Sequence, residues 1–93
     1  MSVGTHPATA QAGFALATVL FLRTKYRETE RVLRRVERSL TENLGPDNEN
    51  LAAVYKALGS VSEKLGKEEE TRRYAMLFGS LLKKNQEGKG ERT

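Results

Sequence analysis

Leu44-Gly45-Pro46-Asp47-Asn48 is the strongest break in a 93-residue sequence that otherwise favours helix along most of its length. Gly45 suits the left-handed conformation that commonly ends a helix, and Pro46 cannot continue one. Asp47 or Asn48 is expected to cap the following helix by accepting hydrogen bonds from its free amides. The segment therefore predicts the end of one helical unit and the start of another.

The parts of the chain on either side of this break are similar to each other. When the sequence is shifted by 42 residues, residues 8–43 align with residues 50–85, and ten of the 36 aligned pairs are identical. The identical pairs are Ala10/Ala52, Ala15/Ala57, Leu16/Leu58, Val19/Val61, Lys25/Lys67, Glu28/Glu70, Thr29/Thr71, Arg31/Arg73, Leu40/Leu82 and Asn43/Asn85. This is well above chance for such a composition, and it indicates a tandem repeat.

Each repeat is expected to contain two helices. Apolar spacing predicts helices at residues 8–23, 26–43, 49–65 and 67–84, the first starting at His6-Pro7 with Thr5 or His6 as its cap. Short links at Thr24-Lys25 and at Gly66 make each pair an antiparallel hairpin. The predicted fold is all-α, with two tandem antiparallel hairpins and four helices. Its parts are a lead-in (1–7), repeat one (8–43), a linker (44–48), repeat two (49–85) and a disordered polar tail (86–93).

The apolar residues predict which helix faces are buried. The first helix is apolar nearly all round, so it should be covered on more than one side. The expected inward residues are Thr29, Leu33, Val36 and Leu40 in the second helix, Leu51, Val54, Tyr55, Leu58, Val61 and Leu65 in the third, and Thr71, Tyr74, Ala75, Phe78, Leu81 and Leu82 in the fourth. Glu30 with Arg34, and Arg38 with Glu42, are spaced for ion pairs on the outer face of the second helix.

Composition argues against several classes of protein. Cysteine is absent, which excludes a disulfide framework and a thiolate metal site and fits a reducing, cytoplasmic location. The net charge of +4 is small, and half of it falls in residues 83–92, so it is a weak indication of nucleic-acid binding. The longest apolar run, residues 15–22, is far shorter than the roughly 20 residues of a membrane span, and no basic residue precedes it as in a secretory signal.

The sequence offers little that could carry catalysis. His6 is the only histidine and has no partner nearby in sequence, so it is interpreted as a linker or cap residue. Glu68, Glu69 and Glu70 would fan out around a helix and cannot converge on one metal ion. A phosphate-binding loop and a nucleophile elbow are both missing from the sequence. We therefore expect a protein that is not an enzyme and has no cofactor or metal.

The repeat resembles the tetratricopeptide repeat, in its 42-residue form found in kinesin light chains and their relatives. Leu44-Gly45-Pro46-Asp47-Asn48 is similar to the Leu-Gly-x-x-His-Pro linker of that form, and His6-Pro7 keeps the His-Pro itself. Leu16-Ala17 and Leu58-Gly59 match its Leu-small pair, and residues 26–30 match its turn motif with Thr29 in place of alanine. The resemblance covers residues 6–85. The weaker motifs of the second copy are typical of a C-terminal capping unit.

The resemblance implies a function in protein–protein interaction, as an adaptor or scaffold. In that family the first helices of successive repeats line a concave groove for an extended peptide or a partner helix. The positions expected to bind a partner here are Gln11, Phe14, Thr18, Leu22, Lys56, Ser60 and Lys64. Members that clamp a peptide backbone often have asparagine where this chain has Phe14-Ala15 and Lys56-Ala57, which argues against that clamp. An apolar patch with a lysine rim would suit an acidic-hydrophobic segment.

Two other functions remain open from the sequence. Arginines form a basic stripe along the second helix that could meet nucleic acid, although glutamates are interleaved with it and favour a solvated face. The stripe comprises Arg27, Arg31, Arg34, Arg35 and Arg38. Alternatively, the apolar first helix could mediate self-association or packing with further repeats, because two repeats are fewer than usually stand alone.

Overall fold

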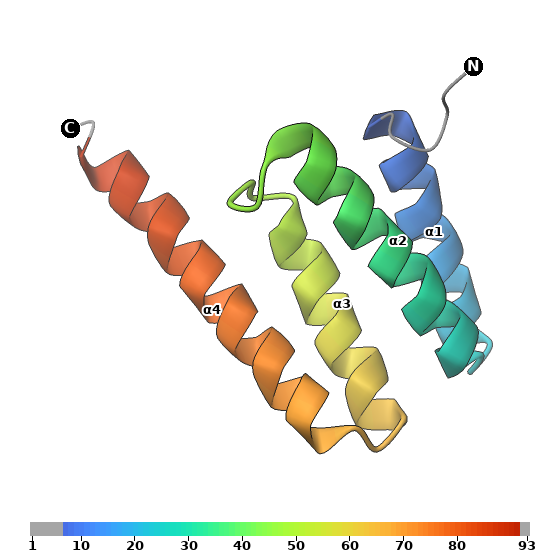
Figure 1. The fold of residues 1–93 in the computed structure, drawn as a ribbon. Coiled ribbons are helices and arrows are strands. Elements are labelled where there is room, and N and C mark those ends of the chain that lie inside the picture. The colour runs from blue at the N-terminus through green and yellow to red at the C-terminus, as the bar shows by residue number, and fades with distance from the viewer. Residues whose placement is uncertain (1–6, 92–93) are drawn as a thin grey trace.

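The four predicted helices are present in the computed structural model, which describes the backbone of residues 7–91 and the side chains of residues 10–86 (Figure 1). They are α1 (Pro7–Leu22), α2 (Tyr26–Leu44), α3 (Leu51–Lys64) and α4 (Glu68–Glu91), and these residues include no strand. The all-α prediction is confirmed. The predicted cap at Thr5 or His6 lies outside the described residues, as does the rest of the lead-in before Pro7.

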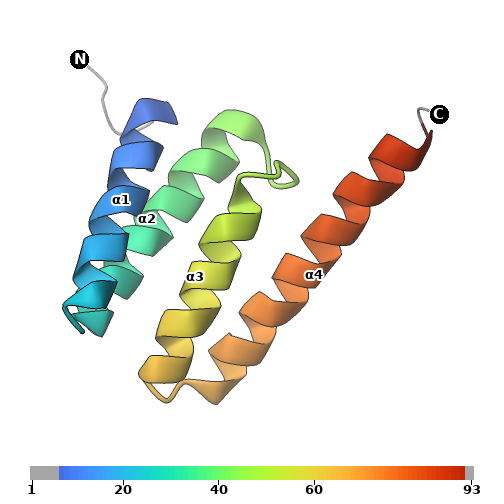
Figure 2. The same cartoon turned by 180° about the vertical axis from the view of Figure 1, so that it is seen from behind.

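The helices form a row of two hairpins. α1 packs against α2, α2 against α3, and α3 against α4. Figures 1 and 2 show α1 at one edge of the row and α4 at the opposite edge. The molecule measures 44 × 38 × 18 Å, so it is about two helix diameters thick. Each helix can therefore bury only the sides that meet its immediate neighbours.

One apolar core runs through the row and is deepest at α3. Leu51, Leu58 and Val61 have no exposed surface, and the inward residues predicted for α2 are also buried. The buried apolar side chains are Ala10, Ala17, Leu33, Val36, Leu40, Leu51, Val54, Tyr55, Leu58, Val61, Tyr74 and Leu81. The two helices in the middle of the row, α2 and α3, each have a neighbour on both sides, and they supply most of these buried side chains.

The predicted inward face of α4 is only partly correct. Tyr74 and Leu81 are buried and Phe78 is half-buried, but Ala75 and Leu82 are exposed. In α2 the residues 42 positions earlier, Leu33 and Leu40, are buried. The difference arises because α3 packs against α2, whereas in the described part of the chain no helix packs on the far side of α4.

The predicted disordered tail is wrong for most of its length, because α4 continues to Glu91. Gly88 and Gly90 each weaken a helix by about 1 kcal/mol relative to alanine, but neither stops it as proline would. These residues extend a helix that packing has already nucleated, so each added residue gains a backbone hydrogen bond without a new nucleation cost.

The linker between the hairpins caps the end of α2 and the start of α3 in different ways. Gly45 ends α2 with φ 92° and ψ 162°, as expected for glycine, and its N–H donates to the Thr41 carbonyl at 3.0 Å. The predicted cap of α3 is wrong: the residue before α3 is Asn50, which makes no side-chain cap hydrogen bond. Asn48 instead donates from Nδ2 to the carbonyls of Gly45 (2.6 Å) and Leu40 (3.3 Å). It therefore closes α2, while backbone carbonyls accept from the first amides of α3.

Ion pairs join the two hairpins on one face. The predicted pair between Glu30 and Arg34 forms at 3.3 Å, and Glu30 also accepts from Lys67 Nζ at 3.0 Å. Arg34 reaches Glu70 at 3.4 Å. The predicted pair between Arg38 and Glu42 does not form among the described residues. The cross-hairpin pairs are partly exposed, so each contributes at most about 1 kcal/mol.

The turns inside the two hairpins have the same hydrogen bonds. Lys25 N–H donates to the Leu20 carbonyl and Lys67 N–H to the Ser62 carbonyl, both at 2.9 Å. Thr24 and Gly66 each close the inner bond of this Schellman pattern and have φ values of 60° and 76°. Glycine adopts this conformation freely, whereas a β-branched threonine is strained in it.

Replacing Thr24 with glycine is therefore expected to stabilise the fold. Thr24→Gly should raise the free energy of unfolding by about 1 kcal/mol, because relief of the left-handed strain exceeds the added chain entropy. The reverse change at the equivalent turn, Gly66→Thr, should lower it by about 1–2 kcal/mol. Urea denaturation of the two variants measures both values. Equal stability of both variants and the wild-type chain would contradict the assignment of strain to Thr24.

Candidate functional site

Two adjoining hollows lie between α1 and α3, with α2 beneath them. The first, about 380 Å³, is lined by Ala10, Gln11, Phe14, Val36, Leu40, Leu44, Asn50, Ala53 and Val54. The second, about 330 Å³, is lined by Phe14, Ala17, Thr18, Phe21, Leu22, Thr29, Leu33, Ala53, Lys56, Ala57 and Ser60. Phe14 and Ala53 line both, so the hollows form one continuous depression, which we name the α1–α3 groove.

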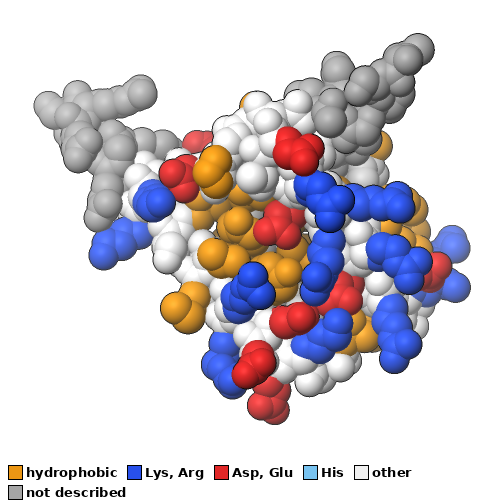
Figure 3. All heavy atoms as spheres, viewed as in Figure 1, with side chains coloured by type: hydrophobic (Ala, Val, Ile, Leu, Met, Phe, Trp, Pro, Cys, Tyr) orange, Lys and Arg blue, Asp and Glu red, His pale blue; other side chains and the backbone are white. Residues whose placement is uncertain are grey.

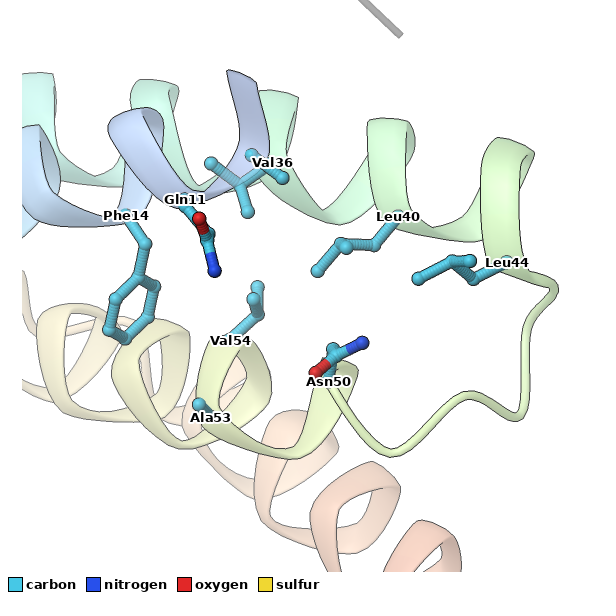
Figure 4. Close-up of a pocket in the computed structure, with 9 residues that line it drawn as sticks. Gln11, Phe14, Val36, Leu40, Leu44, Asn50, Ala53 and Val54 are labelled. Atoms are coloured by element: carbon cyan, nitrogen blue, oxygen red, sulfur yellow. The ribbon is translucent and has the colours of Figure 1, made fainter. Parts of the chain in front are cut away.

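Side chains from three helices meet in the first hollow (Figure 4). Phe14 extends from α1 toward α3, and Gln11 points into the space beside it. Val36 and Leu40 come from α2 and form the floor opposite Val54 of α3. The groove is therefore shaped by the packing of one repeat against the next.

Six of the seven predicted partner-binding residues line the groove. Gln11 lines the first hollow, Phe14 lines both, and Thr18, Leu22, Lys56 and Ser60 line the second. Leu22 is 76% exposed, so its side chain stands at the rim. Lys64 is exposed on the last turn of α3 but lines neither hollow.

Sequence reasoning missed the contribution of the linker end of the groove. Leu44 and Asn50 flank the linker and line the first hollow. Leu44 is 47% exposed and continues the stripe of Leu33, Val36 and Leu40 by one more helical step of four residues. That spacing was the available signal for Leu44; nothing in the sequence singled out Asn50.

The groove is mainly apolar, with its charge confined to one wall. Lys56 is the only charged residue among those lining the two hollows, and no charged residue occurs in Pro7–Leu22 of α1. The Thr18 hydroxyl donates to the Phe14 carbonyl at 3.0 Å, which leaves the hydroxyl oxygen free to accept a hydrogen bond. The groove thus offers apolar surface, an acceptor and one cation.

The basic stripe of α2 lies elsewhere. Figure 3 shows Lys and Arg side chains over α2, with Asp and Glu side chains among them. Arg27, Arg31 and Arg34 border a separate hollow of about 540 Å³ together with Glu30. Because Glu30 and Glu70 hold the Arg34 guanidinium, part of the positive charge of the stripe is already compensated.

Burial shifts the pKa values of two titratable groups next to the stripe. Burial raises the pKa of the Glu37 carboxyl, although Arg34 and Arg73 oppose the shift. Burial also raises the pKa of the Tyr74 hydroxyl. The Tyr55 and Tyr74 rings stack on each other with their centroids 6.2 Å apart, and both residues are buried. These rings are therefore committed to packing between α3 and α4 and do not form a platform for nucleic-acid bases.

Two further properties concern the described residues as a group. No three His, Cys, Asp or Glu side chains in this part of the chain lie close enough together to hold a metal ion. None of the four helices combines the length and the apolar character that crossing a lipid bilayer demands.

Comparison with known proteins adds no relative. No family model, no curated protein and no solved structure matches the chain.

Proposed function

We propose that this chain is a tetratricopeptide-like module that binds a protein segment in the α1–α3 groove, as an adaptor or scaffold without enzymatic activity. The observation that carries the proposal is the convergence of six residues from two repeats on one apolar groove. Exposed apolar surface in a concave site is typical of binding surfaces for peptides and helices.

The chemistry of the groove favours one class of segment. Leu22, Phe14 and the neighbouring alanines would cover apolar side chains, while Lys56 would pair with a carboxylate. Lys64, two helical turns further along α3, would attract a second acidic residue. The expected ligand is therefore an apolar segment with acidic residues on the side that meets α3.

Nucleic-acid binding by the basic stripe of α2 is the less favoured alternative. Three carboxylates, Glu30, Glu37 and Glu70, lie among or against the arginines of the stripe. Their negative charge lowers the number of phosphates that the stripe could neutralise. Tyr55 and Tyr74 are buried against each other, so these two rings cannot add base stacking to the attraction between the arginines and phosphates.

The proposal can be tested with peptides that are selected from a random display library for binding to the folded chain. Leu22→Ala should weaken the selected peptides about five- to tenfold, because a largely exposed leucine gains burial only in the complex. Lys56→Glu should reverse the preference for acidic peptides. Isothermal titration calorimetry measures both effects.

Matched variants on α4 serve as controls. Met76 is 72% exposed, close to the exposure of Leu22, and does not line the groove. Met76→Ala and Lys83→Glu should leave peptide affinity unchanged. Peptides that bind the Leu22 and Lys56 variants as tightly as the wild type would contradict the groove assignment. Salt-dependent binding of a DNA or RNA oligonucleotide that is lost in Arg31→Glu would support the alternative instead.

A further inference from the structure

The contact between the two repeats is built from two apolar helix faces. α2 contributes Leu33, Val36 and Leu40, which are 1, 4 and 7% exposed. α3 contributes Val54, which points toward α2 in Figure 4, and Leu58 and Val61 follow it at steps of four and seven residues. Residues at these steps share one side of a helix, and all three are at most 1% exposed.

The α3 half of this contact recurs on α1, where it is open. The residues 42 positions before Val54, Leu58 and Val61 are Ala12, Leu16 and Val19, which we name the head face. Leu16 and Val19 are identical to their counterparts, yet they are 50% and 47% exposed. A hollow of about 350 Å³ between α1 and α2 includes Ala12 and Leu16 in its lining.

The α2 half of the contact recurs on α4, where it is also open. The residues 42 positions after Leu33, Val36 and Leu40 are Ala75, Phe78 and Leu82, which we name the tail face. Leu82 is 41% exposed, Ala75 is exposed and Phe78 is half-buried. The head and tail faces lie on the two helices at opposite edges of the row (Figures 1 and 2).

We propose that a second copy of this chain stacks on the first head to tail, with the head face of one copy covering the tail face of the other. A second copy is the occupant because the chain carries both halves of a contact that it already makes internally. The same geometry that buries Leu58 against α2 would bury Leu16 of one copy against α4 of the next. Such an interface is heterologous and leaves one head and one tail open, so association continues beyond the dimer. It would also extend the α1–α3 groove from copy to copy.

Charges at the edge of the contact differ between the internal and the intermolecular version. Inside the chain, Glu30 pairs with Lys67 across the repeats at 3.0 Å. Their counterparts at the head-to-tail junction are Arg72 of one copy and Lys25 of the next, which repel each other. Added salt should therefore strengthen association of the wild-type chain, and Arg72→Glu should tighten it about threefold by recreating the internal pair.

Sedimentation velocity of the full chain tests the proposal. Concentrations from about 10 µM to 1 mM cover the weak dissociation constant expected of such a small interface. The wild-type chain should sediment faster with rising concentration. Leu16→Glu and Leu82→Glu should each be monomeric, and each leaves one face intact. An equimolar mixture of these two variants should form a 1:1 dimer and nothing larger.

The remaining outcomes separate head-to-tail stacking from other modes of association. A dimer formed by either glutamate variant alone would show symmetric pairing of like faces and would overturn the proposal. A wild-type chain that stays monomeric at 1 mM, or an Arg72→Glu chain that associates no more tightly, would also overturn it. Circular dichroism establishes that each variant is folded, and Val19→Glu replaces Leu16→Glu if the latter is not.

Discussion

Leu58→Ala is expected to lower the free energy of unfolding by about 2–5 kcal/mol, a large part of the stability of a domain of this size. Leu58 has no exposed surface. It lies on the face of α3 that packs against α2, and α3 has α4 on its other side. Removing its side chain leaves a cavity that the surrounding helices can close only in part, so the lost contacts are not recovered.

Leu16→Ala is the matched control, because Leu16 occupies the equivalent position in the first repeat and is 50% exposed. Its truncation should cost about 1 kcal/mol or less, since half of the side chain is already in water. Chemical denaturation at a few micromolar keeps self-association from contributing to either value. Equal losses in the two variants would contradict the burial of Leu58 and the exposure of Leu16.

The sequence was sufficient to predict the helices and their pairing because the signals for both are local. The glycines that end helices, the proline of the linker and the apolar spacing act within a few residues of one another. The positive φ values of Gly45 and Gly66 confirm the predicted turns. The 42-residue period then located the boundary between the hairpins.

The predictions of burial, helix capping and helix length were wrong where they depended on residues that are distant in sequence but close in space, or on the preceding helix. Ala75 and Leu82 fit an inward stripe by periodicity, but their burial requires a further helix beside α4. Asn48 has the residue type of a cap for α3, yet the reversal of the chain at Gly45 brings its side chain to the end of α2. Composition made residues 86–91 look disordered, whereas the helix that precedes them decides their conformation.

The candidate groove was predictable to the extent that it follows helix faces. Gln11, Phe14, Thr18 and Leu22 lie at steps of three and four residues on α1, so one correct face brings them all to the groove. Lys64 does not line the groove, because neither hollow extends to the last turn of α3. Asn50 became a lining residue only through the path of the linker.

Tyr74→Ala is expected to lower the free energy of unfolding by about 3–5 kcal/mol, the cost typical of truncating a buried aromatic side chain. Tyr74 is 7% exposed, and its ring stacks on that of Tyr55 of α3 with the ring centroids 6.2 Å apart. The two helices approach closely there, since a Cβ on Gly59 would lie 3.7 Å from the Tyr74 Cβ. No other large aromatic residue of α4 is buried to this extent in the described part of the chain.

The loss should also be uneven along the chain, because α4 packs mainly against α3. Its links to the first hairpin and the linker include the Arg34–Glu70 and Lys84–Asp47 ion pairs. In a row of repeats each element is held mainly by its neighbours, so Tyr74→Ala should release α4 before the other helices unfold. Hydrogen exchange should then show α4 amides losing protection first. Tyr74→Phe is the control and should change stability by less than about 0.5 kcal/mol, because it keeps the stacked ring. Equal loss of protection in all four helices of the Tyr74→Ala variant would indicate that the two hairpins unfold as a single unit.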